Sequence, residues 1–250
     1  MNSEEKIFLN HLKDLDRMAL EKNKAFFSDF MDPYEYSLFL TNNKLFSSYM
    51  DTYNLVDNLE RQMVAFRSDA SFVDEYPIDF IKIEPKSAKF AGEITHRDIL
   101  GTIMGLQIER KNIGDILACD GFFVVLCKNT MTEMLLNSID RVRRTDVKLS
   151  KIDDIQNLDF GTRFIEKTGS VSSNRLDALI SEIFNLSRGT ASELVKDEVV
   201  FVNNKLVTKC TYECKDGDKI SVRKHGKVRI DEIGDINRKG KTKVKFSLYK

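Results

Sequence analysis

The sequence predicts an α+β protein with a helical N-terminal region, a mixed middle domain and a small C-terminal domain. Three observations support this prediction. Apolar residues recur at helical spacing near the N-terminus, strand and helix patterns alternate in the middle, and two short amphipathic helices precede tight turns near the C-terminus. A length of 250 residues suits one large domain or two to three small domains. The predicted boundaries are 1–75 for the N-terminal region, 76–150 for the middle domain, 151–171 for a linker and 172–250 for the C-terminal domain.

The N-terminal region is predicted to be mainly helical. Apolar residues repeat every three or four positions after Ser3, which predicts a helix that begins there. Asp32-Pro33 predicts the start of a second helix, because the aspartate can cap free N–H groups and proline suits the first turn. The aromatic residues at 26–39 are expected in the core, with stacking on bases as the alternative. Residues 44–69 show a weaker pattern that assigns no element.

The middle domain shows the order strand-helix-strand-strand-helix-strand. Alternating apolar residues predict a first strand at Pro77–Glu84, and Thr95 can cap the helix after it. Asp120-Gly121 predicts a hairpin turn between the next two strands. A second helix is expected after Asn129, followed by extended segments near Val142–Leu149. This is the ferredoxin-like, or RRM-like, arrangement, which many RNA-binding domains and many unrelated domains share.

The C-terminal domain is predicted to contain two helices and a small sheet. Leu176–Phe184 has the apolar spacing of an amphipathic helix, and Ser187 can cap a second helix. Asn203-Asn204 and Asp216-Gly217 predict tight turns between short strands. Two short helices and a small sheet are enough to bury one modest core.

Positive charge is concentrated in this C-terminal domain. The formal net charge of the chain is zero, but residues 172–250 contain 17 Lys+Arg against 11 Asp+Glu. A closing hairpin carries Lys241, Lys243 and Lys245 on one face of its return strand. These lysines either protect an exposed sheet edge from aggregation or extend a phosphate-binding surface, and we favour the second interpretation. A basic domain on an acidic remainder is the pattern expected when one domain meets phosphate.

The two predicted helix starts of this domain carry arginines. Arg175 precedes the first helix, and Arg188 follows the predicted cap Ser187 of the second. Helix N-termini have free N–H groups, and next to arginine they suit phosphate oxygens. From charge and helix ends alone, an ordinary solvated surface is the alternative.

Four motifs follow one another in this region: Arg175-Leu176-Asp177, Leu186-Ser187-Arg188, Val200–Asn203 and Lys215–Asp218. They resemble the R-L-D, L-S-R, V-x-V-N-G-K and P-G-D motifs of the S-four RNA-binding domain, named after a small-subunit ribosomal protein. Asn204 stands where glycine is usual, and asparagine tolerates the positive φ of such a turn; Asp216 stands where proline is common. The resemblance implies a two-helix face on structured RNA, with contacts at Arg175, Ser187, Arg188, Thr190, Lys196, Asn203 and Lys205. We add Arg238, Lys239 and Lys241 of the closing hairpin.

A second set of motifs resembles the YlmH family of bacterial S-four proteins. The family reads H-R-D-x-L-G, then an arginine, then I-G-D-I, which corresponds here to His96–Gly101, Arg110 and Ile113–Ile116. Asp29–Pro33 and Glu60-Arg61 also fit its N-terminal region, although the Gly-Gly-Tyr turn that usually precedes Glu-Arg is missing from residues 49–53. The resemblance implies a non-enzymatic protein that binds ribosomal RNA and transfer RNA on the large ribosomal subunit, with a part in quality control of stalled translation.

His96-Arg97-Asp98 allows three interpretations. A histidine beside an aspartate could act as a general base, and H-R-D also occurs in kinases, but the glycine-rich loop and D-F-G of kinases are absent. We favour capping of a helix start, with Arg97 pointing outward. An RNA contact by Arg97 is the second interpretation. The short basic segment with Arg141, Arg143 and Arg144 is expected to add secondary RNA contacts if it faces the C-terminal domain.

Other functional classes remain as alternatives. S-four domains also serve RNA-modifying enzymes such as pseudouridine synthases and methyltransferases, but the twelve glycines never occur as G-x-G. A protein-only adaptor is the third class, and it would show no salt-dependent RNA affinity. We therefore predict no catalytic residue, metal, cofactor or small-molecule substrate.

Cysteine use and hydropathy predict a cytoplasmic protein. The four cysteines form no C-x-x-C pair, which favours reduced thiols over a zinc site. The first residues are charged throughout and lack the apolar stretch of a signal peptide. Because no apolar run approaches the length of a membrane span, we expect no membrane partner.

Overall fold

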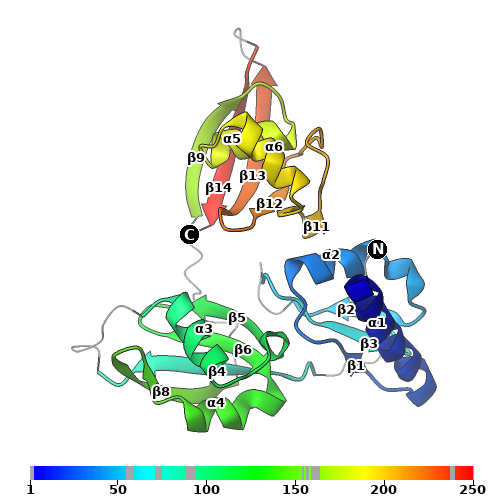
Figure 1. The fold of residues 1–250 in the computed structure, drawn as a ribbon, viewed down its shortest axis with the longest axis vertical. Coiled ribbons are helices and arrows are strands. Elements are labelled where there is room, and N and C mark those ends of the chain that lie inside the picture. The colour runs from blue at the N-terminus through cyan, green and yellow to red at the C-terminus, as the bar shows by residue number, and fades with distance from the viewer. Residues whose placement is uncertain are drawn as a thin grey trace. The chain divides into compact units, whose positions relative to one another are not determined.

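The computed structural model describes residues 3–54, 59–70, 75–87, 94–153, 155, 158, 164–236 and 240–249. Contacts group the chain into two compact units (Figure 1). Unit 1 contains residues 1–35 and 42–161, and unit 2 contains residues 36–41 and 162–250. The predicted α+β class is confirmed, because each unit combines helices with at least one antiparallel sheet.

The N-terminal region combines two helices with a small sheet that the sequence did not predict. Its elements are α1 (Ser3–Lys22), β1 (Phe26–Phe27), α2 (Pro33–Thr41), η1 (Asn43–Leu45), β2 (Tyr49–Thr52) and β3 (Val64–Arg67), with sheet order β1-β3-β2. The segment without the family's glycine turn, residues 49–52, is a regular strand paired with β3. The predicted start of α2 is correct: Asp32 Oδ1 accepts hydrogen bonds from the N–H groups of Tyr34 and Glu35 at 2.8 and 2.9 Å.

The middle domain has the predicted ferredoxin-like order. Its elements are β4 (Ile78–Pro85), α3 (His96–Gly105), η3 (Arg110–Asn112), β5 (Ile113–Ala118), β6 (Phe123–Lys128), η4 (Asn129–Met131), α4 (Thr132–Ser138), β7 (Arg141–Val142) and β8 (Thr145–Ile152). The sheet order β5-β6-β4-β8-β7 places the first and third strands of the motif, β4 and β6, side by side in the middle. Thr95 caps α3 as predicted, and Asp98 completes a capping box.

Both faces of this middle sheet are buried at its centre. On one face, Ile81, Ile83 and Val125 pack with residues of α3 and α4. On the other face, Ile78, Phe80, Val124 and Leu126 pack with Phe30, Leu59 and Met63 of the N-terminal region and with Ile155. The N-terminal region and the middle domain therefore share a core within unit 1.

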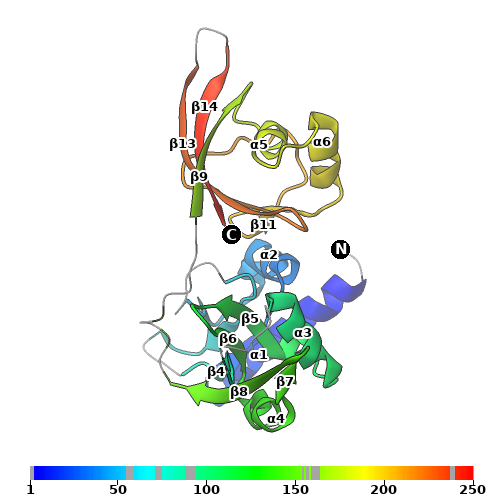
Figure 2. The ribbon, with the colours of Figure 1, turned by 90° about the vertical axis from the view of Figure 1, so that its left-hand side faces the viewer.

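The C-terminal domain places two helices on one side of a six-stranded sheet (Figures 1 and 2). Its elements are β9 (Phe164–Val171), α5 (Leu176–Ile183), α6 (Arg188–Lys196), β10 (Val200–Val202), β11 (Lys205–Leu206), β12 (Lys219–Val222), β13 (Gly226–Ile236) and β14 (Thr242–Tyr249). The sheet order is β11-β10-β12-β13-β14-β9. Apolar residues of both helices and of the inner sheet face form one core, which includes Leu179, Ile180, Val195, Ile220 and Val228.

Strand β9 corrects two expectations from the sequence. Residues 164–171 were assigned to the linker, but they form the edge strand of the C-terminal sheet and pair with β14 along its whole length. The return strand of the closing hairpin is therefore internal, between β13 and β9, so Lys243 and Lys245 do not protect a sheet edge. β9 has no clear strand pattern in the sequence because its residues from Glu166 to Ser170 are polar or glycine, and of residues 165–171 only Val171 is buried.

Candidate nucleic-acid interface

One buried carboxylate organises the two arginines of the C-terminal domain. Asp177, with a side-chain exposure of 4%, accepts hydrogen bonds from Arg175 Nε and Nη2 at 3.1 and 3.0 Å. It also accepts from Arg188 Nε and Nη2 at 3.3 and 3.4 Å. Both guanidiniums remain open to solvent, with side-chain exposures of 38% for Arg175 and 48% for Arg188. The structure therefore brings the two predicted arginines together as a pair, which we call the arginine pair.

The charge of Asp177 keeps this pair in place. Burial favours a raised pKa for Asp177, but the hydrogen bonds and charges of Arg175 and Arg188 outweigh burial, so the pKa lies below its usual value. The carboxylate is therefore ionised at neutral pH and holds both guanidiniums in fixed orientations. Arginines that are already oriented lose less conformational freedom when they bind a phosphate.

The first backbone N–H groups of α5 are hydrogen-bonded to another segment of the same domain. Leu176 N and Asp177 N donate to the carbonyl oxygens of Tyr212 and Cys210 at 2.8 and 3.4 Å. These backbone groups are therefore already used, which corrects the expectation of free N–H groups at both helix starts. At α5 only the side chain of Arg175 is available to a phosphate.

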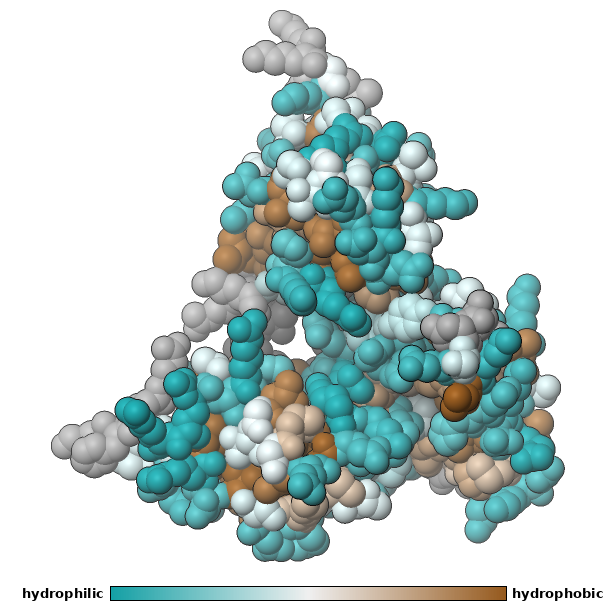
Figure 3. Space-filling view, viewed as in Figure 1, coloured by the Kyte–Doolittle hydropathy of each residue, from teal (hydrophilic) through white to brown (hydrophobic). Residues whose placement is uncertain are grey.

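The N-terminus of α6 remains open. Ser187 caps it as predicted: its Oγ accepts from Thr190 N at 3.0 Å and lies 2.8 Å from Thr190 Oγ1. The backbone amides of Arg188 and Gly189 have no acceptor among the residues that the structure describes. Hydrophilic side chains cover the outer side of this helix (Figure 3). Ser187 and Thr190 therefore shape the helix start, and the two open amides and Arg188 face solvent together.

The first hairpin presents one lysine to solvent. Asn203 and Asn204 occupy its turn with φ values of 50° and 63°, which explains why asparagine replaces glycine here. The Asn203 side chain donates to Asp218 Oδ1 at 2.8 Å and accepts from Lys219 N at 2.9 Å. Asn203 thus holds the turn against the next strand, and Lys205 is the exposed cation of the hairpin.

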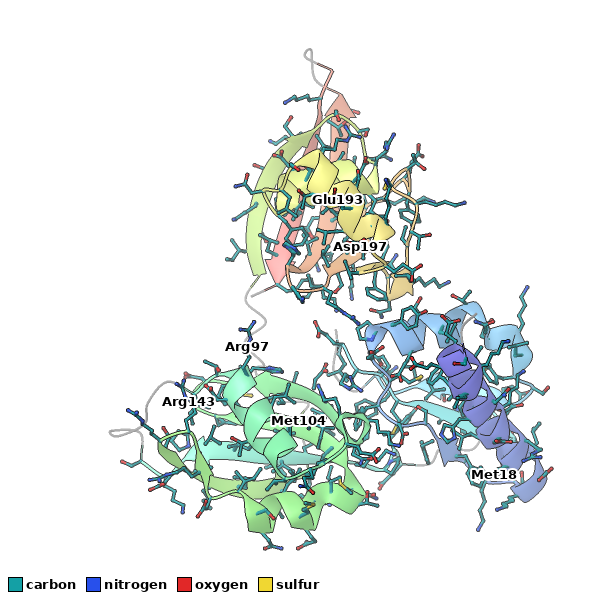
Figure 4. All side chains as sticks on the ribbon, viewed as in Figure 1. Met18, Arg97, Met104, Arg143, Glu193 and Asp197 are labelled. Carbon is teal, nitrogen blue, oxygen red and sulfur yellow. The ribbon has the colours of Figure 1, made fainter. Side chains whose placement is uncertain are left out.

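The other predicted contacts lie apart from the arginine pair. Lys196 is in the last turn of α6, about 12 Å along the helix axis from Arg188. Glu193, three residues before it in the helix, and the C-cap residue Asp197 (both labelled in Figure 4) reduce the local positive charge. Of the closing hairpin, Lys241 is exposed, and Arg238 and Lys239 lie outside the described residues.

The sheet of this domain also carries a depression that the sequence did not predict. Its volume is about 540 Å³, and it is lined by Glu166, Lys167, Thr168, Arg229, Asp231 and Lys245. Arg229 Nε donates to Asp231 Oδ1 at 2.7 Å, and Lys245 pairs with Glu232. Because its cations are matched by carboxylates, this depression favours a phosphate less than the arginine pair does.

The secondary arginines lie on the middle domain, in two different situations. Arg141 is bound to Asp146 at 3.0 Å. Arg143 lies 3.6 Å from Asp98 and is 66% exposed. Arg97 and Arg144 are exposed and have no hydrogen bond or ion pair within the described part of the chain.

Family motifs from distant parts of unit 1 converge on the start of β5. Asp115 accepts hydrogen bonds from the backbone N–H groups of Glu60 and Arg61 at 2.6 and 3.2 Å. Arg110 donates from Nη1 to the two carbonyl oxygens at 113–114. The motifs Glu-Arg, Arg and I-G-D therefore have a shared structural role: they join the N-terminal region to the middle domain.

Gly114 lies at the closest point of this junction. A Cβ atom at Gly114 would lie 2.7 Å from Phe30 Cε1 and 2.9 Å from Leu126 Cβ. Arg61 Nη2 donates to the carbonyl oxygen of Phe30 at 2.6 Å and fixes this segment from the other side. Glycine is required here because the Phe30 ring occupies the space of a side chain.

We expect the stability contributed by Asp115 to depend on pH. Burial, the largest influence, raises its pKa to about 6 in the folded protein, whereas an unfolded aspartate titrates near about 3.9. The folded state thus binds this proton more tightly, and the resulting stability is complete below about pH 4 and lost as the pH rises through about 6. The shift corresponds to about 3 kcal/mol at most.

Urea unfolding of the wild type and of Asp115→Asn between pH 4 and 7 measures this dependence. The unfolding free energy of the wild type minus that of the variant should fall by about 2–3 kcal/mol over this range. Other titrating groups, including Glu35, whose burial raises its pKa, are shared by both proteins and cancel in the difference. A difference that stays constant with pH would contradict the expected proton binding by Asp115.

Comparison with known proteins tests the resemblance to the YlmH family. Residues 72–156 match the sequence profile of a family described as "Putative RNA-binding domain in YlmH". Over 248 residues the chain is 24% identical to the "Ribosome-associated protein quality control protein P2" of Bacillus subtilis (strain 168), and the alignment covers 99% of this chain and 96% of that protein. The predicted resemblance to the YlmH family is confirmed.

The fold is also found in a solved structure, the "Cell division protein ylmH from Streptococcus pneumoniae". The match has a TM-score of 0.50 and 20% sequence identity, and it covers 64% of this chain and 97% of that chain. The YlmH-type domain at 72–156 contains the exposed arginines Arg97, Arg143 and Arg144. Among the helices of the described residues, none has the length and apolar character that a bilayer crossing requires.

Proposed function

We propose that this protein is a cytoplasmic, non-enzymatic RNA-binding protein that acts on the large ribosomal subunit. The observation that carries the proposal is the arginine pair: Arg175 and Arg188 share the buried Asp177, and both guanidiniums stay partly exposed to solvent. Arg188 Nη1 also donates to Ser172 Oγ at 3.1 Å, which further fixes this guanidinium beside the open amides of α6. Guanidiniums and helix N-terminal amides are donors that bind phosphate oxygens. The S-four resemblance of the same segment agrees with this use.

The biological setting comes from the relative in Bacillus subtilis. Its name places that protein in ribosome-associated quality control, and the alignment with this chain is nearly complete on both sides. We infer that this chain contacts ribosomal RNA and transfer RNA on stalled large subunits. In this proposal the primary contacts are Arg175 and Arg188, the N-terminus of α6 with Ser187 and Thr190, and Lys205, with Lys196, Asn203 and the closing hairpin in supporting positions.

Co-sedimentation with purified ribosomal subunits across a salt series tests this function. Binding to the large subunit should weaken steeply as salt rises, and the logarithmic slope should fall by about 0.7–0.9 for each phosphate contact that is lost by mutation. The small subunit is the matched control, because it offers the same phosphate chemistry. Equal binding to both subunits would contradict the assignment to the large subunit. Tight binding to free RNA without subunit binding would contradict the ribosomal assignment and favour an RNA-modifying enzyme.

A further inference from the structure

The YlmH-type domain has the ferredoxin-like order of RRM domains, which bind RNA on one face of their sheet. In this protein the centre of that face is covered by residues of the N-terminal region. In RRM domains, aromatic side chains on the two central strands stack on unpaired bases. The corresponding strands here are β4 and β6, and their outward residues Phe80, Val124 and Leu126 are at most 8% exposed. Phe30, Leu59 and Met63 cover them. Bases therefore cannot stack on the centre of this sheet while unit 1 is folded.

Three exposed arginines of the domain lie elsewhere, at one rim. Arg97 follows the first residue of α3, and Arg143 and Arg144 form the turn between β7 and β8. The side chain of Asp98 connects the two elements, because it caps α3 and lies 3.6 Å from Arg143. Figure 4 shows Arg97 and Arg143 pointing outward from the domain. We call Arg97, Arg143 and Arg144 the arginine rim.

Within the described part of the chain, one carboxylate pairs with the arginine rim. Asp98 is its nearest carboxylate, with a side-chain exposure of 18%, and it already accepts hydrogen bonds from Thr95 N and Oγ1 at 2.9 and 2.7 Å. Asp146 is bound by Arg141. Of the three guanidiniums only that of Arg143 pairs with a carboxylate within the described part of the chain, and exposed positive charge of this kind attracts phosphate.

The backbone conformation at Arg143 does not favour arginine. Its φ is 53°, in the left-handed region where glycine and asparagine are the favoured residues of a two-residue hairpin turn. A residue that strains its turn and makes only one long ion pair gives the fold little benefit. Its exposed guanidinium is free to serve a ligand.

We propose that the YlmH-type domain binds the phosphate backbone of double-stranded RNA through the arginine rim and not through its sheet. The duplex is favoured over single strands because the described residues 75–87 and 94–153 contain no exposed aromatic side chain on which a base could stack. Contacts from cations to the backbone read the shape of a helix. This site is separate from the arginine pair of the C-terminal domain. The proposal rests on the proposed function only in taking RNA as the ligand.

The test uses the full chain and a fluorescein-labelled RNA duplex of about 16 base pairs, with one of its strands as the single-stranded probe. The rim variant carries Arg97→Gln, Arg143→Gln and Arg144→Gln. Fluorescence anisotropy across a salt series should show duplex affinity reduced about 10- to 100-fold and a logarithmic salt slope reduced by about 2–3. A control with Lys6→Gln, Lys13→Gln and Arg17→Gln removes the same charge from exposed positions of α1 and should change duplex affinity less than about twofold.

A further variant separates binding from folding. Arg143→Gly relieves the left-handed backbone, so it should raise the melting temperature by a few degrees and still weaken duplex binding. A lower melting temperature with unchanged binding would overturn the proposal, because Arg143 would then serve the fold alone. Single-stranded RNA that binds more tightly than duplex, and equally to the rim variant, would also overturn it.

The outcomes for the two sites can be told apart. If Arg175→Gln with Arg188→Gln leaves RNA binding unchanged while the rim variant weakens it, the proposed function of the C-terminal domain fails and the rim proposal stands. If only the C-terminal variant weakens binding, the rim proposal fails. If both weaken it and their effects add, both sites bind independently.

Discussion

Replacing Arg175 and Arg188 together with glutamine is expected to lower the affinity for the large ribosomal subunit by at least about 100-fold. Each guanidinium that donates to a phosphate contributes about 1.5–3 kcal/mol, so the loss of two contacts costs about 3–6 kcal/mol. The logarithmic salt slope should fall by about 1.4–1.8 at the same time. Filter binding or co-sedimentation at several salt concentrations measures both quantities.

Glutamine is the appropriate substitution because of the buried carboxylate beside both arginines. A glutamate at either position would place a second negative charge next to Asp177 and would disturb the fold, whereas a glutamine can still donate a hydrogen bond to it. Arg229→Gln is the matched control: this arginine is 42% exposed, is bound to Asp231 and belongs to the same domain. If the control weakens binding as much as the double variant, the arginine pair is not the RNA contact.

Phe30→Ala is expected to destabilise unit 1 by about 3–5 kcal/mol. Phe30 is 1% exposed and belongs to the core that joins the N-terminal region to the middle sheet. Truncation of such a ring removes its burial and leaves a cavity. Urea unfolding followed by circular dichroism measures the change, and Tyr49→Ala, at an exposed aromatic of the same region, should cost much less.

A double variant tests whether Phe30 and Gly114 are in contact as described. Gly114→Ala alone should destabilise by about 1–3 kcal/mol, because its Cβ would meet the Phe30 ring at 2.7 Å. In the Phe30→Ala background the same substitution should cost less, because the ring is gone and only Leu126 Cβ remains close. Additive effects of the two substitutions would show that this contact does not exist.

The helix starts and turns could be predicted because a few neighbouring residues determine them. Thr95, Asp32 and Ser187 cap helices with their own side chains, and the caps form where the sequence indicated. Asn203-Asn204 forms the expected tight turn because both residues adopt positive φ. The order of strands and helices in the middle domain followed from such local signals.

The parts that escaped prediction depend on distant partners. β3 is buried throughout and pairs with both β1 and β2, but no local alternation distinguished it. Asp177 was visible as part of a motif, yet its role depends on Arg188, which approaches it only when α6 folds back on α5. Phe30 likewise covers the middle sheet by packing on Phe80 and Val124, which lie about 50 and 90 positions later in the chain.

The position of β14 between β13 and β9 has a consequence for the kinetics of folding. β13 and β14 are consecutive in the chain and can zip together as a hairpin in microseconds. β9 pairs with residues 71 to 85 positions away, from Val171 with Thr242 to Phe164 with Tyr249, so its docking must first close a long loop. We therefore expect β9 to pair later in folding than the β13–β14 hairpin forms, and, as an edge strand, to be more prone to local opening than the strands inside the sheet.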